Sequence, residues 1–150
     1  MPSTFRSFTG LDMPEFDSVY AEVEPGYEEK ERRADDSHPF KLTLSNRLLM
    51  LLVYYRLYVT SRLVSFLFDL DHSNVLRDMR MLEPVVRELL PIPQKLHDRA
   101  ERVVVEHTIA LLKKFKIMGQ EFRNRLRHND ITTDIVSGLI NLRIMGTVTL

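Results

Sequence analysis

The chain contains no cysteine among its 150 residues. This absence excludes disulfide bridges, thiol nucleophiles and thiolate metal sites, and it fits a reducing compartment such as the cytosol. Long apolar runs are also missing. The longest covers residues 48–55 and ends at Arg56, far short of the roughly 20 residues that a membrane-spanning helix needs. Since the N-terminal residues have no apolar signal core either, we expect a cytoplasmic protein with no membrane association.

An excess of charge of one sign is missing overall, because 21 basic residues cancel 21 acidic ones. The balance is uneven, however: residues 1–36 hold four basic and ten acidic residues, and the remainder is basic. The apolar fraction of 44% is sufficient for a folded core. An acidic head followed by a basic body permits an anionic partner such as DNA, without establishing one.

The acidic head is separated from the rest by the polar stretch 35–39, which ends in a proline. Apolar residues at helical spacing predict short helices within it. The second is expected to open near Pro14 and to end before Pro25. We predict three segments: a helical appendage over residues 1–39, a compact helical unit over 40–97 and a C-terminal helical segment over 98–150.

Helical periodicity is strongest between residues 42 and 90, where apolar side chains recur at intervals of three and four. A first helix is predicted over residues 44–58, with Thr43 or Ser45 as its N-cap. Thr60 is expected to cap a second, shorter helix. The residues predicted to turn inward from that helix are Leu63, Val64, Leu67 and Phe68.

A third helix is predicted to begin after Asp71, a good N-cap, with Leu70 and Val75 forming a hydrophobic staple across its first turn. Pro84 removes one backbone donor, so we expect this helix to kink or restart near Met81. Later in the chain, a helix is predicted over residues 98–116 and an apolar helix over 132–142. Residues 144–150 are expected to be a strand or a frayed end.

Three helices with a short turn between the second and third are the pattern of a helix-turn-helix, in which the third helix lies in the major groove of DNA. Its polar residues suit that role, because Asn pairs with adenine, Arg with guanine, and Ser or His with phosphate. A polar stripe is also the ordinary solvated face of an amphipathic helix, and periodicity alone favours that interpretation. The candidate DNA-binding residues are His72, Ser73, Asn74, Arg77 and Arg80, with Asp78 on the same outward face and Arg47 on the first helix.

Several stretches resemble the N-terminal helix-turn-helix domain of insertion-sequence transposases of the DDE superfamily. They are residues 5–11, 28–30, 44–57 and 66–75, and the similarity extends over about residues 5–100. Relatives often have glycine at the start of the turn, where this chain has Asp69. The resemblance implies recognition of the terminal inverted repeats of a mobile element.

The last third of the chain resembles a later part of the same proteins. Arg102, Glu106 and Lys113 keep the spacing found around the final acidic residue of the DDE triad, and that spacing places them on one stripe of a helix. Residues 115–117, 122–127 and 135–143 continue the similarity. The resemblance implies a remnant of an RNase H-like catalytic domain, whose full-length relatives use Mg or Mn.

The sheet that carries the first two catalytic Asp residues in such relatives has no counterpart here, because residues 96–101 run directly into the Glu106 helix. Two-metal phosphoryl transfer needs several converging acidic ligands. We therefore expect an internally deleted transposase that is all-α, has no cofactor or metal, and is not an enzyme, with Glu106, Arg102 and Lys113 as a non-functional remnant.

Two functions remain open. The first is a nucleoid-associated, non-catalytic protein that binds double-stranded DNA at inverted repeats or related operators. It would repress or compete with intact transposase, and its protein partners would be that transposase or a second copy of itself. The second is an inactive structural remnant with no physiological activity.

Overall fold

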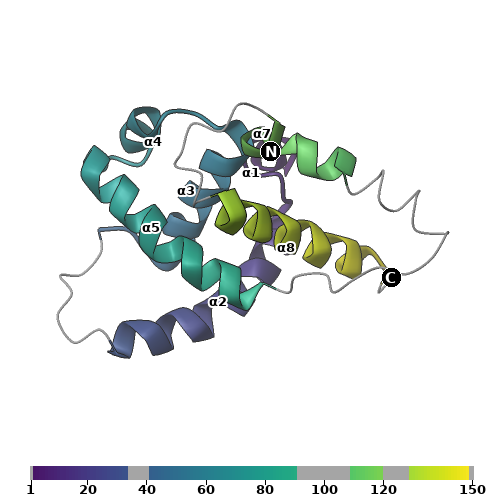
Figure 1. The fold of residues 1–150 in the computed structure, drawn as a ribbon, viewed down its shortest axis with the longest axis horizontal. Helices are drawn as coiled ribbons and strands as arrows, with labels where there is room; N and C mark the ends of the chain where they lie inside the picture. Colours follow the sequence, from purple (N-terminus) through teal and green to yellow (C-terminus); the bar gives the residue numbers. More distant parts are fainter. Residues whose placement is uncertain (1, 34–40, 91–108, 120–128, 149–150) are drawn as a thin grey trace.

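The computed structural model describes residues 2–33, 41–90, 109–119 and 129–148. Within these ranges every regular element is a helix, which confirms the predicted all-α class. Residues 109–114 are also helical and lead through a bend at Phe115 into the next helix. The labelled helices in Figure 1 are α1 (Pro2–Thr9), α2 (Met13–Arg33), α3 (Leu44–Leu57), α4 (Ser61–Leu67), α5 (His72–Leu89), α7 (Lys116–Gly119) and α8 (Asn129–Val148).

The three central helices begin at side chains that cap them. Thr43 accepts a hydrogen bond from the backbone N–H of Asn46, and Thr60 accepts one from Leu63. Asp71 accepts one from the N–H of Ser73 at 2.8 Å. Each cap satisfies a backbone donor that the helix itself leaves unpaired, a contribution of about 1 kcal/mol. The predicted starts of α3, α4 and α5 are therefore confirmed.

The turn between α4 and α5 has a left-handed residue at Asp69, with φ of 49°. Glycine reaches this conformation without strain, and aspartate is among the few other residues that adopt it readily. The Nζ of Lys41 lies 2.8 Å from the Asp69 carboxylate and also donates to its carbonyl oxygen. This explains why a non-glycine residue can start the turn.

Two helices continue through prolines that were expected to end or interrupt them. Helix α2 passes Pro25 and reaches Arg33, and α5 passes Pro84 and reaches Leu89. The expected end before Pro25 is thus wrong, and α5 does not restart near Met81. The kink expected there as the alternative stays a prediction. A proline costs one hydrogen bond, and around Pro84 this loss is offset by packing, since Leu82 and Val86 on either side are both buried.

The C-terminal helix is longer than the predicted range 132–142. Helix α8 covers Asn129–Val148, so the expectation of a strand or frayed end from residue 144 is wrong for residues 144–148. Once a helix is nucleated by packing, each further residue adds a hydrogen bond at little cost. Of the predicted helix over 98–116, residues 98–108 lie outside the described ranges and residues 109–114 are helical.

One core joins the three predicted segments. Helix α3 lies at its centre, with eight of its 14 residues buried. Val19 and Val23 of α2, Leu82 of α5 and Ile135 of α8 belong to the same cluster. Figure 1 shows α8 running beside α5, and both helices contact α2. The acidic head and the C-terminal segment therefore pack on the central helices instead of forming separate cores.

Helix α4 is covered on only one side. Val64 is fully buried and Phe68, just beyond the helix, packs partly against the core. Leu63 and Leu67 are exposed, contrary to the predicted inward orientation, and the neighbouring Phe66 is 81% exposed. A helix of 7 residues has two turns, so contact with α5 on one face leaves the others in solvent.

In the part of the chain that the structure describes, no helix is long and apolar enough to cross a membrane.

Candidate nucleic-acid interface

The N-terminal half of α5 presents a polar face to solvent. Ser73, Asn74, Arg77 and Arg80 are all exposed. Ser73, Arg77 and Arg80 are four and three residues apart, so they lie along one stripe of the helix. The opposite stripe is buried and consists of Val75, Met79, Leu82 and Val86. The exposed side chains therefore belong to a helix whose other side packs against the core.

His72 differs from the other candidates because it is half-buried at the first residue of α5. A ring nitrogen, Nε2, lies 2.8 Å from the hydroxyl oxygen of Ser61, the first residue of α4. This hydrogen bond joins the starts of the two helices across the turn between them. Ser61 was not among the predicted site residues, since its relation to His72 depends on how α4 and α5 cross.

Arg47 was predicted to contact DNA, and the structure contradicts this because its side chain is only 1% exposed. Its Nε lies 3.5 Å from a carboxylate oxygen of Asp78. Its Nη1 donates a hydrogen bond to the hydroxyl of Tyr27, over whose ring the guanidinium also lies. The cause is tertiary: α2 continues past Pro25 and carries Tyr27 over this part of α3.

Asp78 is the second correction, since it was expected on the outward face of α5 and is only 4% exposed. Its position, three residues after Val75, belongs to the inner stripe of the helix. Burial raises the pKa of the Asp78 carboxyl, and the charges of Arg47 and Arg77 oppose this rise. The exposed face of α5 is therefore basic. Asp78 lies on the buried side of the helix and pairs with Arg47 of α3.

Residues 40–92 match the model for the helix-turn-helix of DDE superfamily endonucleases. This segment is therefore similar to the helix-turn-helix domain of that superfamily. It contains α3, α4 and α5, with the exposed stripe on its third helix, and the match indicates DNA binding. No curated protein and no solved structure matched the chain.

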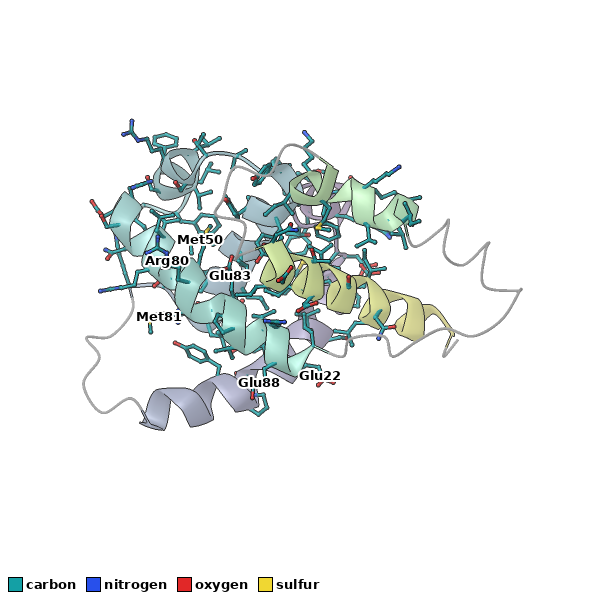
Figure 2. The ribbon with its side chains drawn as sticks, viewed as in Figure 1. Glu22, Met50, Arg80, Met81, Glu83 and Glu88 are labelled. Carbon is teal, nitrogen blue, oxygen red and sulfur yellow. The ribbon has the colours of Figure 1, made fainter. Side chains whose placement is uncertain are left out.

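A buried pair, Tyr55 and Glu83, joins α3 to α5. The Tyr55 hydroxyl donates to a carboxylate oxygen of Glu83 at 3.0 Å, and it also hydrogen-bonds with the side chain of Thr132 in α8. Figure 2 shows Glu83 on the side of α5 that faces α8, with Arg80 nearer the start of the helix. This pair attaches the third helix of the domain to α3 and α8.

Burial raises the pKa of the Glu83 carboxyl, while the hydrogen bond from Tyr55 and the charge of Arg80 lower it in part. Burial also raises the pKa of the Tyr55 hydroxyl, and the Glu83 charge raises it further. Burial therefore favours the neutral form of each group. We assign the pair a structural role in the attachment of α5 to α3 and α8.

Of the three residues that resemble the catalytic Glu region, the structure describes one. Lys113 is exposed on the helical stretch 109–114, whereas Arg102 and Glu106 lie outside the described residues. Among the residues that the structure describes, no group of three His, Asp or Glu side chains could hold a metal ion.

Proposed function

We propose that this protein is a non-catalytic DNA-binding protein that inserts α5 into the major groove of terminal inverted repeats or related operator DNA. The observation that carries the proposal is the exposed stripe of Ser73, Arg77 and Arg80, with Asn74 beside it, on a helix whose other face is buried. Arg pairs bidentately with guanine and Asn with adenine, and each such contact discriminates against the wrong base by about 1–3 kcal/mol.

The absence of catalysis is part of the proposal. Its support is the sequence, in which residues 96–101 run straight into the segment around Glu106 and leave no length for a sheet with two catalytic Asp residues. A transposase with an internal deletion would keep end recognition and lose strand transfer. Such a protein would occupy the repeats on the nucleoid and so repress or compete with an intact transposase.

The direct test measures binding of the full chain to a labelled duplex that carries the inverted repeat flanking its gene. A shuffled duplex of the same composition serves as the reference, and fluorescence anisotropy is recorded at several salt concentrations. We expect tighter binding to the repeat, and Arg77→Ala is expected to cost about 1–3 kcal/mol on the repeat and little on the shuffled duplex. Lowering salt should strengthen binding to both.

The matched control is Lys113→Ala, which removes an exposed cation outside the helix-turn-helix domain. It should leave the preference for the repeat unchanged. Equal affinity for the two duplexes, with no effect of Arg77→Ala, would overturn the proposal and favour the alternative that the protein is an inactive structural remnant.

A further inference from the structure

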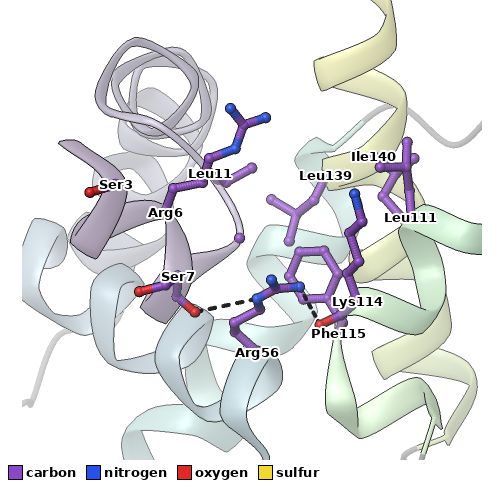
Figure 3. Close-up of a pocket in the computed structure, with 11 residues that line it drawn as sticks. Ser3, Arg6, Ser7, Leu11, Arg56, Leu111, Lys114, Phe115, Leu139 and Ile140 are labelled. Carbon is purple, nitrogen blue, oxygen red and sulfur yellow. Dashed lines mark hydrogen bonds between the residues drawn. The ribbon is translucent and has the colours of Figure 1, made fainter.

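A pocket of about 420 Å³ lies where α1, α3, the stretch 109–115 and α8 meet (Figure 3). No residue of α5 lines it, so it is distinct from the face proposed to bind DNA. Its volume is in the range of small-molecule sites. Part of its wall is apolar and is formed by Leu11, Leu111, Phe115, Leu139 and Ile140.

The polar part of the wall is positively charged. Arg6, Arg56 and Lys114 all line the pocket, together with Ser3 and Ser7, and no described lining residue is acidic. The like charges act on one another: burial lowers the pKa of Arg56, and the nearby charge of Arg6 lowers it further. Cations gathered around a partly apolar cavity favour an anion, because it relieves their repulsion and accepts charge-assisted hydrogen bonds.

Arg56 is held in place by contacts on both sides of the pocket. Its Nε donates to the carbonyl oxygen of Ser7 at 3.4 Å, and its Nη1 donates to the carbonyl oxygen of Lys114. The guanidinium carbon lies 5.8 Å from the centre of the Phe115 ring. Figure 3 shows Arg56 between these groups, with dashed lines to both carbonyls. Since a guanidinium has five N–H donors, it retains donors for a bound anion.

Gly10 allows the walls of the pocket to come together. It has φ of +86°, and a Cβ at this position would lie 2.8 Å from Cζ of Phe115. A larger residue would push the Phe115 ring, and with it the stretch that carries Lys114, away from α1. The pocket therefore depends on the close approach of the head segment to the C-terminal segment.

We propose that this pocket binds a small organic anion. The phosphate or carboxylate group is held by Arg6, Arg56 and Lys114, and an apolar or aromatic part lies against Phe115 and Leu139. A DNA backbone offers the phosphate and no apolar group to cover that wall, so the chemistry of the site selects a small amphipathic ligand. This site is independent of recognition by α5.

The test uses isothermal titration calorimetry on the full chain with three probes at constant ionic strength: phenyl phosphate, inorganic phosphate and benzyl alcohol. Phenyl phosphate combines the charge with the ring, so we expect it to bind one to one and roughly ten-fold or more tightly than either other probe. Arg6→Gln and Lys114→Gln remove exposed cations, and each is expected to weaken binding by about ten-fold or more.

Lys113→Gln is the matched control, because it neutralises the neighbouring exposed residue, which does not line the pocket. It should bind phenyl phosphate as the unmodified chain does. Circular dichroism confirms that each variant is folded. Undetectable binding of phenyl phosphate, or binding that Arg6→Gln and Lys114→Gln leave unchanged, would overturn the proposal.

Binding to duplex DNA distinguishes two roles for Arg6 and Lys114: binding a small anion in the pocket or contacting the DNA backbone. If Arg6→Gln and Lys114→Gln weaken binding to the shuffled duplex while phenyl phosphate does not bind, the pocket is a backbone-contact site and the small-anion proposal is wrong. Loss of phenyl phosphate binding in both variants, with repeat recognition retained, supports the pocket independently of the DNA-binding proposal.

Discussion

Arg47 of α3 and Asp78 of α5 form an ion pair at the buried boundary between their helices, with Nε 3.5 Å from Oδ2. Both side chains are nearly inaccessible, at 1% and 4% exposure. The pair lies directly behind the basic stripe of the helix-turn-helix domain, on the inner face of α5. It positions α5 against α3 and leaves the exposed arginines of α5 to solvent.

Replacing Asp78 is expected to lower the free energy of unfolding more than replacing Arg47. Asp78→Asn leaves a buried guanidinium that cannot lose its charge, and we expect a loss of about 3 kcal/mol in the free energy of unfolding. Arg47→Met leaves a carboxyl whose pKa burial already raises, so it can take up a proton, and the loss should be smaller.

Urea unfolding of the two variants measures this order. Arg77→Ala, an exposed position on the same helix, serves as the control and should stay within about 0.5 kcal/mol of the unmodified chain. A greater loss for Arg47→Met than for Asp78→Asn would contradict the argument.

The Tyr55–Glu83 pair predicts a pH-dependent stability. Because burial raises the pKa of Glu83 above its ordinary value of 4.5, the folded state holds the proton more tightly than the unfolded state. The contribution of this group is therefore most favourable below about pH 4.5 and is lost as pH rises through the folded pKa. Glu83→Gln should stabilise the protein at pH 7 relative to its effect at pH 4.

Tyr55→Phe tests the same pair and is expected to destabilise the protein at pH 7, whereas Glu83→Gln is expected to stabilise it. It removes the donor to Glu83, so at pH 7 it should destabilise the protein by about 1–3 kcal/mol, and by less at pH 4. Unfolding free energies at pH 4, 5, 6 and 7 provide the measurement. Differences from the unmodified chain that do not vary with pH would refute the role assigned to Glu83.

The left-handed turn residue predicts a contrast between two substitutions. Asp69→Gly should be close to neutral, because glycine adopts φ near 49° without strain and compensates for losing the exposed contact with Lys41. Asp69→Val should cost about 1–2 kcal/mol, since a β-branched residue fits this conformation poorly. Thermal unfolding compares the two variants. Equal midpoint temperatures for Asp69→Gly and Asp69→Val would contradict the argument.

The Ser61–His72 hydrogen bond predicts an effect on binding. Ser61→Ala releases the ring at the start of α5, so affinity for the repeat should fall by about ten-fold at most while stability changes by about 1 kcal/mol. Ser65→Ala is the control, because the Ser65 hydroxyl donates to the backbone carbonyl of Arg62 within α4. Anisotropy with the repeat duplex compares them, and equal affinities would assign His72 no positioning role.

The local features of the fold follow from residues that are close together in the chain. Thr43, Thr60 and Asp71 were predicted as caps because a side chain bonds to a backbone N–H within three residues, which requires no distant contact. The helical pattern likewise predicted the exposure of Ser73, Asn74, Arg77 and Arg80. Whether those four residues contact DNA stays a prediction.

Contacts between distant segments set which polar residues are buried and which helices continue through a proline. The sequence predicted Arg47 and Asp78 to be exposed, but both are buried where α3 crosses α5, and Tyr27 covers Arg47. The passage of α5 through Pro84 and the gathering of Arg6, Arg56 and Lys114 around one pocket are of the same kind. Such features depend on contacts between segments far apart in the chain, whose energies outweigh local preference and leave no mark in residue spacing.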